Sequence, residues 1–264
     1  MHIGSMPLCG VHPTQERYGE DMKLQKLLSL TRQAVENYQL IEEGDKIAVG
    51  ISGGKDSLVL LLALSNLKKF YPKNFELYGI TVDLGYGSFD TSKISKLCQS
   101  LDVPYHVVKT EISAIVKTEA KPCSLCAKLR KGALNQKALE LGCNKVAFAH
   151  HADDLIETML LSLLYEGRFH SCSPVTYWSH TKLTLIRPLI YLKEADIIGF
   201  VNKNPLPILV NPCPYEGHTR RTYVKDMLQQ LNKDIPGCKN RLFRAILSGN
   251  FEDWPSSSNG KETS

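Results

Sequence analysis

Short apolar runs alternate along most of the chain with longer segments in which apolar residues recur every three to four positions. The short runs predict β-strands and the periodic segments predict α-helices. We expect strands at 48–51, 75–83, 105–109, 145–149 and 183–190. We expect helices at 58–70, 90–101, 126–141, 154–165, 194–202, 219–231 and 239–247. Because strands that alternate with helices form βαβ units, the pattern predicts an α/β fold with a parallel five-stranded sheet covered by helices on both faces.

The segments outside this core differ in character. Apolar residues at helical spacing predict a helix within 21–44, whereas 166–180 has little periodicity and is expected to be a mobile loop. The polar segment after residue 254 is expected to be disordered. The predicted organisation is an extension at 1–20, a helix at 21–44, a nucleotide-binding domain at 45–192, a helical part at 193–254 and a tail at 255–264.

The turn between the first strand and its helix reads SGGKDS. A strand that enters a helix through glycines points unpaired backbone N–H groups and the helix dipole at one spot, which suits phosphate oxygens. Gly53 and Gly54 allow close approach of the backbone, and Lys55 adds a cation. The turn is not a Walker A loop, because that motif would need glycine at Val49 and a hydroxyl at Asp56. An ordinary surface turn is the alternative interpretation.

A second group of polar residues follows the fourth strand in the order His150, His151, Asp153, Asp154. The carboxyl ends of parallel strands meet at one edge of the sheet, so this group, Asp83 and the SGGKDS turn should face one cleft. There the group could contact ATP, magnesium or a reacting base. Simple helix capping by Asp154 is the alternative.

Three cysteines form a candidate metal site. Cys123 and Cys126 lie at the predicted start of a helix, where the helix dipole lowers thiol pKa values, and Cys213 lies between two prolines. This incomplete set suits a 4Fe-4S cluster with one iron open, or zinc with a fourth ligand such as His218. A redox dithiol and buried cysteines remain alternatives, and Cys9 with His12 forms a weaker candidate pair.

The composition limits the classes of protein that the chain can belong to. With 264 residues, of which 43% are hydrophobic, the chain can bury a normal core. No apolar stretch could span a bilayer and no signal peptide is evident, so we expect a cytoplasmic protein with no membrane contact. A net charge of +5 permits an RNA partner. The basic residues Lys121, Lys128, Arg130, Lys131, Arg220 and Arg221 flank the cysteines.

The order of the motifs is specific. SGGKDS, PCSLCAKLRKGAL, AHHADDLIET, IRPLIYLKEADI and NPCPY with a nearby arginine pair resemble the tRNA 2-thiocytidine synthetase (TtcA-like) family of PP-loop ATP pyrophosphatases over about residues 22 to 247. The resemblance implies a PP-loop fold, ATP with Mg²⁺, and a 4Fe-4S cluster held by Cys123, Cys126 and Cys213.

The SGGKDS turn and the residues expected at the same edge of the sheet supply the other candidate site residues. Those that would bind the cofactor are Gly50, Ile51, Ser52, Gly53, Gly54, Lys55, Asp56, Ser57, Asp83, His150 and Asp153. Asp56, His151 and Asp154 would be catalytic. The implied partners are tRNA and a sulfur donor such as a cysteine desulfurase, and the implied assembly is a homodimer.

The predicted function is ATP-dependent 2-thiolation of cytidine or uridine in tRNA. ATP would adenylate the base carbonyl, and sulfur would then replace the adenylated oxygen. A PP-loop ligase or sulfurtransferase acting on a small molecule, or a zinc-containing amide-forming ligase, is the alternative. A zinc-containing RNA-binding module is a third possibility, which the intact SGGKDS turn disfavours.

Overall fold

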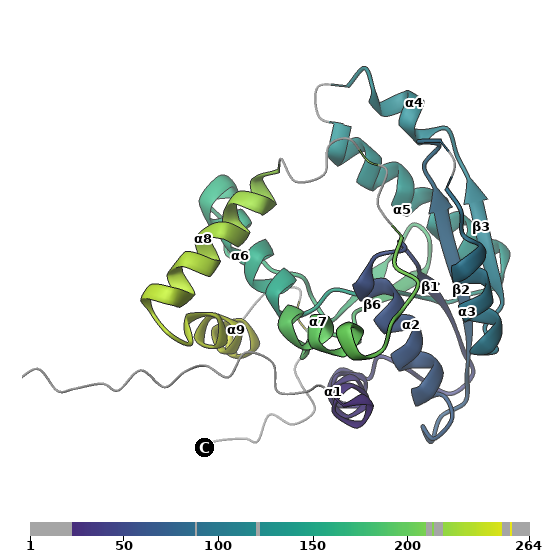
Figure 1. The fold of residues 1–264 in the computed structure, drawn as a ribbon, viewed down its shortest axis with the longest axis horizontal. Coiled ribbons are helices and arrows are strands. Elements are labelled where there is room, and N and C mark those ends of the chain that lie inside the picture. The colour runs from purple at the N-terminus through teal and green to yellow at the C-terminus, as the bar shows by residue number, and fades with distance from the viewer. Residues whose placement is uncertain are drawn as a thin grey trace, which may run out of the picture.

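The structure is a computed structural model that describes residues 23–87, 89–119, 122–209, 213, 219–249 and 254. A single sheet runs through it in the order β3-β2-β1-β4-β6-β5 (Figure 1). The strands are β1 (Asp45–Gly50), β2 (Phe75–Asp83), β3 (Tyr105–Lys109), β4 (Lys145–Ala147), β5 (Val175–Trp178) and β6 (Leu183–Ile186). All neighbours pair in parallel except β5 and β6. The predicted α/β class and parallel core are confirmed.

The prediction of five strands is wrong by one, because β5 lies in the segment 166–180 that was expected to be a loop. Its four residues, VTYW, are β-branched or aromatic, but so short a strand carries no readable alternation. The strand is held by antiparallel pairing with β6, which places Val175 opposite Ile186. The expected strand at 183–190 ends at Ile186 because Pro188 cannot donate a ladder hydrogen bond.

Helices cover both faces of the sheet. They are α1 (Leu24–Asn37), α2 (Lys55–Leu67), α3 (Ser92–Ser100), α4 (Ile112–Val116), α5 (Pro122–Glu140), α6 (Ala152–Glu166), α7 (Glu194–Lys203), α8 (Arg220–Asp234) and α9 (Cys238–Ser248). The short helix α4 was not predicted. In Figure 1, α6, α8 and α9 gather on the side of the molecule away from α3 and β3.

Strand β1 shows how the sheet is buried. Its residues Ile47 and Val49 join the larger apolar core with α1, α2 and α6, whereas Ala48 joins a second core with α4 and α5. Successive side chains point to opposite faces of a strand, so burial of both sets requires helices on both sides. The buried sheet fixes its carboxyl edge, which carries the candidate site. None of the described helices is long and apolar enough to cross a membrane.

Candidate active site

The loop between β1 and α2 is closed by two serines. Ser57 Oγ accepts hydrogen bonds from Ser52 N and Ser52 Oγ, both at 3.1 Å, and donates to Gly54 O at 2.9 Å. Gly54 N donates to Ser52 Oγ at 3.2 Å. Gly53 has a φ of +85°, in the left-handed region that favours glycine. The SGGKDS segment is therefore a tight turn at the N-terminus of α2, as the phosphate-loop interpretation requires.

A chain of alternating charges leads from this loop to the C-terminal helices. Lys55 Nζ lies 3.2 Å from both Asp56 Oδ2 and Glu194 Oε1. The same Glu194 oxygen lies 2.7 Å from Lys225 Nζ on α8. Burial opposes the charged form of Lys55, but the two carboxylates outweigh it and raise the pKa of the ammonium. Asp56 Oδ1 is buried and has no hydrogen-bond partner among the described residues.

The first turn of α6 brings two predicted residues toward Asp56. Asp154 Oδ2 accepts a hydrogen bond from the backbone N of His151 at 3.0 Å, so Asp154 does close the start of the helix. The His151 ring is 5% exposed, and its Nε2 lies 3.4 Å from Asp154 Oδ2 and 3.9 Å from Asp56 Oδ1. Asp154 thus performs capping and also faces the candidate site.

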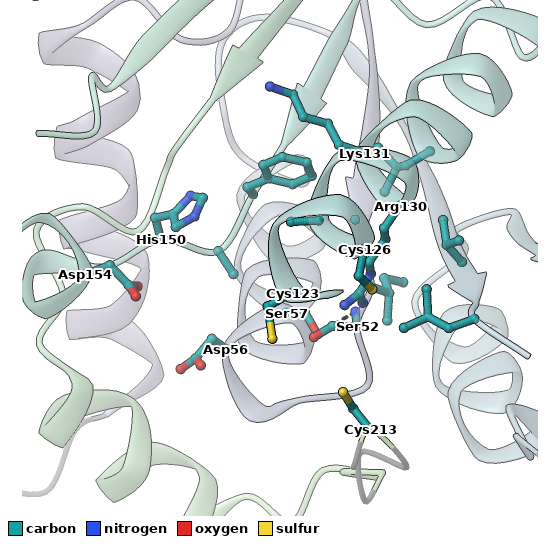
Figure 2. A pocket seen from close by; sticks show the side chains of 18 of the residues that line it. Ser52, Asp56, Ser57, Cys123, Cys126, Arg130, Lys131, His150, Asp154 and Cys213 are labelled. Carbon is teal, nitrogen blue, oxygen red and sulfur yellow. Dashed lines mark hydrogen bonds between the residues drawn. The ribbon is translucent and has the colours of Figure 1, made fainter. Parts of the chain in front are cut away.

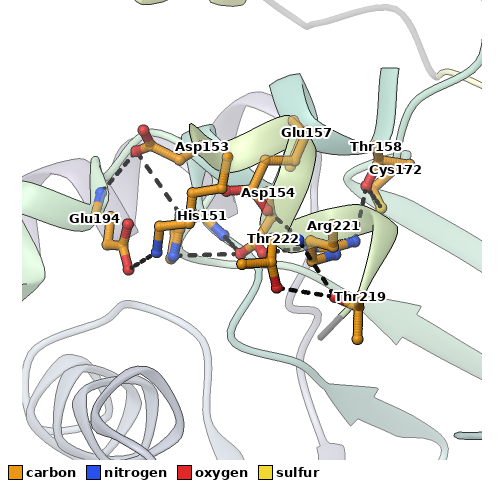
Figure 3. A network of polar contacts seen from close by, with 12 residues as sticks. His151, Asp153, Asp154, Glu157, Thr158, Cys172, Glu194, Thr219, Arg221 and Thr222 are labelled. Carbon is orange, nitrogen blue, oxygen red and sulfur yellow. Dashed lines mark hydrogen bonds and ion pairs between the residues drawn. The ribbon is translucent and has the colours of Figure 1, made fainter. Parts of the chain in front are cut away.

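Figure 3 shows how the C-terminal helices hold this turn. Arg221 Nη1 of α8 lies 2.8 Å from Asp154 Oδ1 and 3.3 Å from Glu157 Oε2. Burial raises the pKa of Glu157, and Arg221 partly offsets that effect. A cavity of about 410 Å³ lies here, lined by residues that include Lys55, Asp56, His151 and Arg221. Three cations therefore border it, the third being Lys225.

The three cysteines and the loop line one cavity of about 690 Å³ (Figure 2). Its lining includes Ser52, Asp56, Ser57, Cys123, Cys126, Cys213, His150 and Asp154. The cysteine pair lies on the first turn of α5, as predicted. The expected lowering of the thiol pKa is not found at Cys126, because burial raises its pKa and the nearby Arg130 only partly opposes this.

The residues that line this cavity include enough thiols to bind a metal centre, although they are not gathered into a ready-made metal site. Cys123, Cys126 and Cys213 supply three thiols to one space, which is the ligand type that iron–sulfur clusters use. Within the described ranges, no three His, Cys, Asp or Glu side chains lie close enough together to hold a metal ion. His218, the expected fourth zinc ligand, and the Cys9–His12 pair lie outside those ranges.

Comparison with known proteins identifies the family of the chain. The PP-loop domain family matches residues 22–231. A tRNA-cytidine(32) 2-sulfurtransferase of Syntrophotalea carbinolica is 37% identical over 86% of this chain and 90% of its own length. The enzyme of the same name from Pelobacter propionicus is 36% identical over 88% of this chain and 89% of its own. The chain belongs to the TtcA-like family of PP-loop proteins.

A solved structure of a tRNA thiolase has a fold similar to that of this TtcA-like chain. The U34-tRNA thiolase NcsA from Methanococcus maripaludis, solved with its [4Fe-4S] cluster, superposes with a TM-score of 0.66. It is 26% identical and covers 84% of this chain and 78% of its own. The resemblance inferred from the motifs is confirmed.

Not all predicted residues of the TtcA-like site lie on its cavities. Gly50 and Ile51 line the larger cavity, whereas Gly53 and Gly54 belong to the loop but do not line it. The Asp83 carboxylate accepts a hydrogen bond from Gly85 N at 3.0 Å, and its neighbours Val82 and Leu84 line the cavity instead.

Asp153 has a different place from the one expected. Its carboxylate accepts hydrogen bonds from Lys239 Nζ of α9 and from Glu194 N of α7, both at 2.8 Å. Burial opposes ionisation of Asp153, but these two donors outweigh it and lower the pKa of the carboxyl. Asp153 therefore joins α6 to two later helices and does not line either cavity.

The basic residues near the cysteines separate into two groups. Arg130 and Lys131 line the cavity, and Lys131 Nζ also lies 3.7 Å from the centre of the Trp178 ring. Lys128 and Arg220 are exposed, and Arg220 stacks 4.5 Å over the Tyr165 ring. Lys121 lies outside the described residues. Lys128 and Arg220 can therefore meet a partner outside the cavity, whereas Lys131 is exposed and also lines it.

Sequence reasoning did not assign five charged residues to the site: Glu157, Arg187, Glu194, Lys225 and Lys239. Arg187 and Glu194 lie in the motif IRPLIYLKEADI, so the resemblance held a signal for them. Lys225 and Lys239 lie in helices with no such motif.

Proposed function

We propose that this protein is an ATP-dependent tRNA sulfurtransferase that 2-thiolates cytidine. The observation that carries the proposal is the single cavity lined by both the PP-loop and the three cysteines. Adenylation and sulfur transfer occur at one base, so the nucleotide loop and the sulfur-handling site must open into the same space. The relatives are named for their action on a cytidine of tRNA, which favours cytidine as the target base of this protein. The name of NcsA indicates uridine for that enzyme instead.

The PP-loop would hold the ATP phosphates. The turn places the start of α2 and its backbone N–H groups at the larger cavity. Lys55 supplies positive charge from the smaller cavity. Mg²⁺ in ATP sites keeps several waters and takes one or two carboxylates besides phosphate oxygens, so it needs no group of three protein ligands. Asp56 fits that role because its Oδ1 is buried without a hydrogen-bond partner among the described residues.

Cys123, Cys126 and Cys213 would hold a 4Fe-4S cluster by three of its irons. When bound, the cluster supplies an open iron that can carry sulfide. The protein's own contribution is to place those three thiols on the cavity that the loop also lines and to limit water there with Phe148, Leu134 and Tyr86. Zinc remains an outcome that metal analysis would identify.

The remaining parts of the proposal rest on the sequence and the family. They are a sulfur donor such as a cysteine desulfurase, a homodimeric assembly and a cytoplasmic location. They also include the division into an extension, an N-terminal helix, the PP-loop domain at 45–192, the helical part at 193–254 and the tail.

The test is conversion of unmodified tRNA by anaerobically purified protein with ATP, Mg²⁺ and sulfide, followed by nucleoside mass spectrometry. We expect ATP-dependent 2-thiocytidine, release of pyrophosphate, and iron with acid-labile sulfide in the protein. Lys55→Ala and Asp56→Ala should abolish both products, whereas Lys69→Ala, at an exposed lysine beyond α2, should not. Wild-type turnover in both loop variants, or a protein containing zinc and no iron, would contradict the proposal.

A further inference from the structure

A buried arginine fixes the orientation and the proton of a histidine on the large cavity. Arg187 directly follows β6, is 8% exposed, and its Nε lies 3.2 Å from Nδ1 of His150. His150 lies just before α6 and lines the cavity (Figure 2). A guanidinium donates hydrogen bonds and cannot accept them, so Nδ1 must be the bare nitrogen of the ring. In neutral His150 the proton is therefore on Nε2.

The charge state of His150 follows from its surroundings. Burial, and then the positive charge of Arg187, lowers the pKa of His150 to about 4. Asp154 on α6 acts in the opposite direction, whereas Arg221 on α8 and the adjacent His151 lower the pKa further. At neutral pH the ring is uncharged. It cannot serve as a general base through Nδ1, because Arg187 occupies that nitrogen.

Arg187 is itself held in place by the edge of the sheet. Its Nη1 donates to the backbone oxygen of Ser173, and lies 3.4 Å from Oγ1 of Thr176 on β5. These contacts leave its Nε facing His150. The strand that the sequence did not predict thus anchors the residue that orients His150.

We propose that His150 is a neutral Nε2–H donor to an acceptor atom, O2 or N3, of the target pyrimidine, and that Arg187 is the positioning residue that imposes this tautomer. The cations Lys55, Lys225 and Arg221 border the neighbouring cavity and suit phosphate oxygens. An uncharged donor beside the Phe148 ring, whose centre lies 6.0 Å from that of His150, suits an uncharged base. This inference rests on the proposed function for the identity of the base, but not for the state of the histidine.

The state of the histidine is tested first, without tRNA. The full-length protein, labelled with ¹⁵N-histidine, should show one of its eight histidines with a protonated Nε2 and a bare Nδ1. That signal should be missing from His150→Gln and should not titrate above about pH 5, given a pKa of about 4. A protonated Nδ1, or titration near neutral pH, overturns the inference even if the enzyme thiolates tRNA.

Variants of Arg187 separate its hydrogen bond from its charge. In Arg187→Gln the side-chain amide N stands at the position of Nε, so the tautomer of His150 should persist while its pKa rises with loss of the cation. In Arg187→Met both the hydrogen bond and the positive charge are lost, so both neutral tautomers of His150 should be populated. An unchanged His150 signal in the Arg187→Met variant would show that Arg187 is not the positioning residue.

The role of the donor is tested by single-turnover thiolation at saturating ATP. The amide N of Gln lies where His Nε2 lies, so His150→Gln should retain most of the rate, whereas His150→Leu should lose on the order of 100-fold, as loss of one site donor typically does. His170→Leu, on the exposed segment after α6, is the matched control and should keep the wild-type rate. Equal rates in His150→Leu and wild type would refute the donor role. If the wild type forms no thiolated base, the proposed function fails, and the nuclear magnetic resonance result is unaffected.

Discussion

Two adjacent glycines of the PP-loop allow backbone strain to be separated from ligand access. Gly53 has a φ of +85°, and a Cβ built there would lie 3.1 Å from Leu209 Cβ. Gly54 has a φ of −76°, and its nearest neighbour would be Ser52 Oγ at 3.4 Å. We therefore expect Gly53→Ala to destabilise the protein without ATP, and Gly54→Ala to leave that stability nearly unchanged.

The magnitude follows from the two conformations. An alanine in the left-handed region costs about 1–2 kcal/mol, and the contact with Leu209 adds to this cost. The lower entropy of the unfolded chain with alanine offsets about 0.4–1 kcal/mol. The strain less this offset leaves about 0–1.6 kcal/mol, and the crowding against Leu209 raises the net loss for Gly53→Ala to about 1–2 kcal/mol. That loss corresponds to roughly 2–8 °C in Tm for a protein of this size. At Gly54 the backbone is already in an ordinary extended conformation, so no strain arises.

The assay is thermal unfolding of both variants without nucleotide, followed by titration with ATP. Gly54→Ala should bind ATP more weakly, because its methyl group would stand between the backbone and a phosphate oxygen. A Gly53→Ala variant with the Tm of the wild type would refute the strain argument. A Gly54→Ala variant with unchanged ATP affinity would refute close approach of a phosphate at that residue.

Three further predictions concern the metal, the RNA and the pH dependence. The variants Cys123→Ala, Cys126→Ala and Cys213→Ala should each lack bound iron after anaerobic purification. The variants at the buried cysteines, Cys98→Ala and Cys143→Ala, should retain iron. Iron at the wild-type level in the first three variants would contradict the ligand assignment. Replacing the exposed Lys128 and Arg220 by alanine should weaken tRNA binding and leave ATP affinity unaltered. The slope of log K against log salt should fall by about 1.4–1.8, because two fewer phosphates are neutralised; an unchanged slope would exclude these residues from the interface. Lys239→Met should lower stability at pH 7 by about 1–2 kcal/mol, since it leaves Asp153 without its ammonium donor. The folded-state pKa of Asp153 is depressed, so the stability that its ionised carboxylate contributes is present above its usual pKa of about 4 and is lost as the pH falls further. The difference in Tm between wild type and Lys239→Met should therefore narrow below about pH 4. A difference in Tm that stays constant with pH would contradict this prediction.

The sequence by itself determined the class of the fold and the identity of the loop. The apolar run at 75–83 coincides with β2, because a strand buried on both faces must be apolar along most of its length. The run at 105–109 coincides with β3, an edge strand that is only partly buried and that its tyrosine and two valines mark as a strand. The SGGKDS turn could be recognised because its chemistry is local: the glycines, the lysine and the helix N-terminus are contiguous. The start of α5 at the cysteine pair was predicted for the same reason.

The tertiary structure decided which distant residues meet. Strand β5 exists because β6 offers it a pairing edge, and its four residues carry too little pattern to predict this. Glu194, Lys225 and Lys239 reach the site because α7, α8 and α9 pack beside α2 and α6, a consequence of burial that no local spacing reports. The state of His150 likewise depends on Arg187, which is 37 residues away in the chain and is brought to it by the carboxyl ends of β4 and β6. Local chemistry can be read from adjacent residues, whereas a pKa or a tautomer depends on whichever charges the packing of the whole chain places nearby.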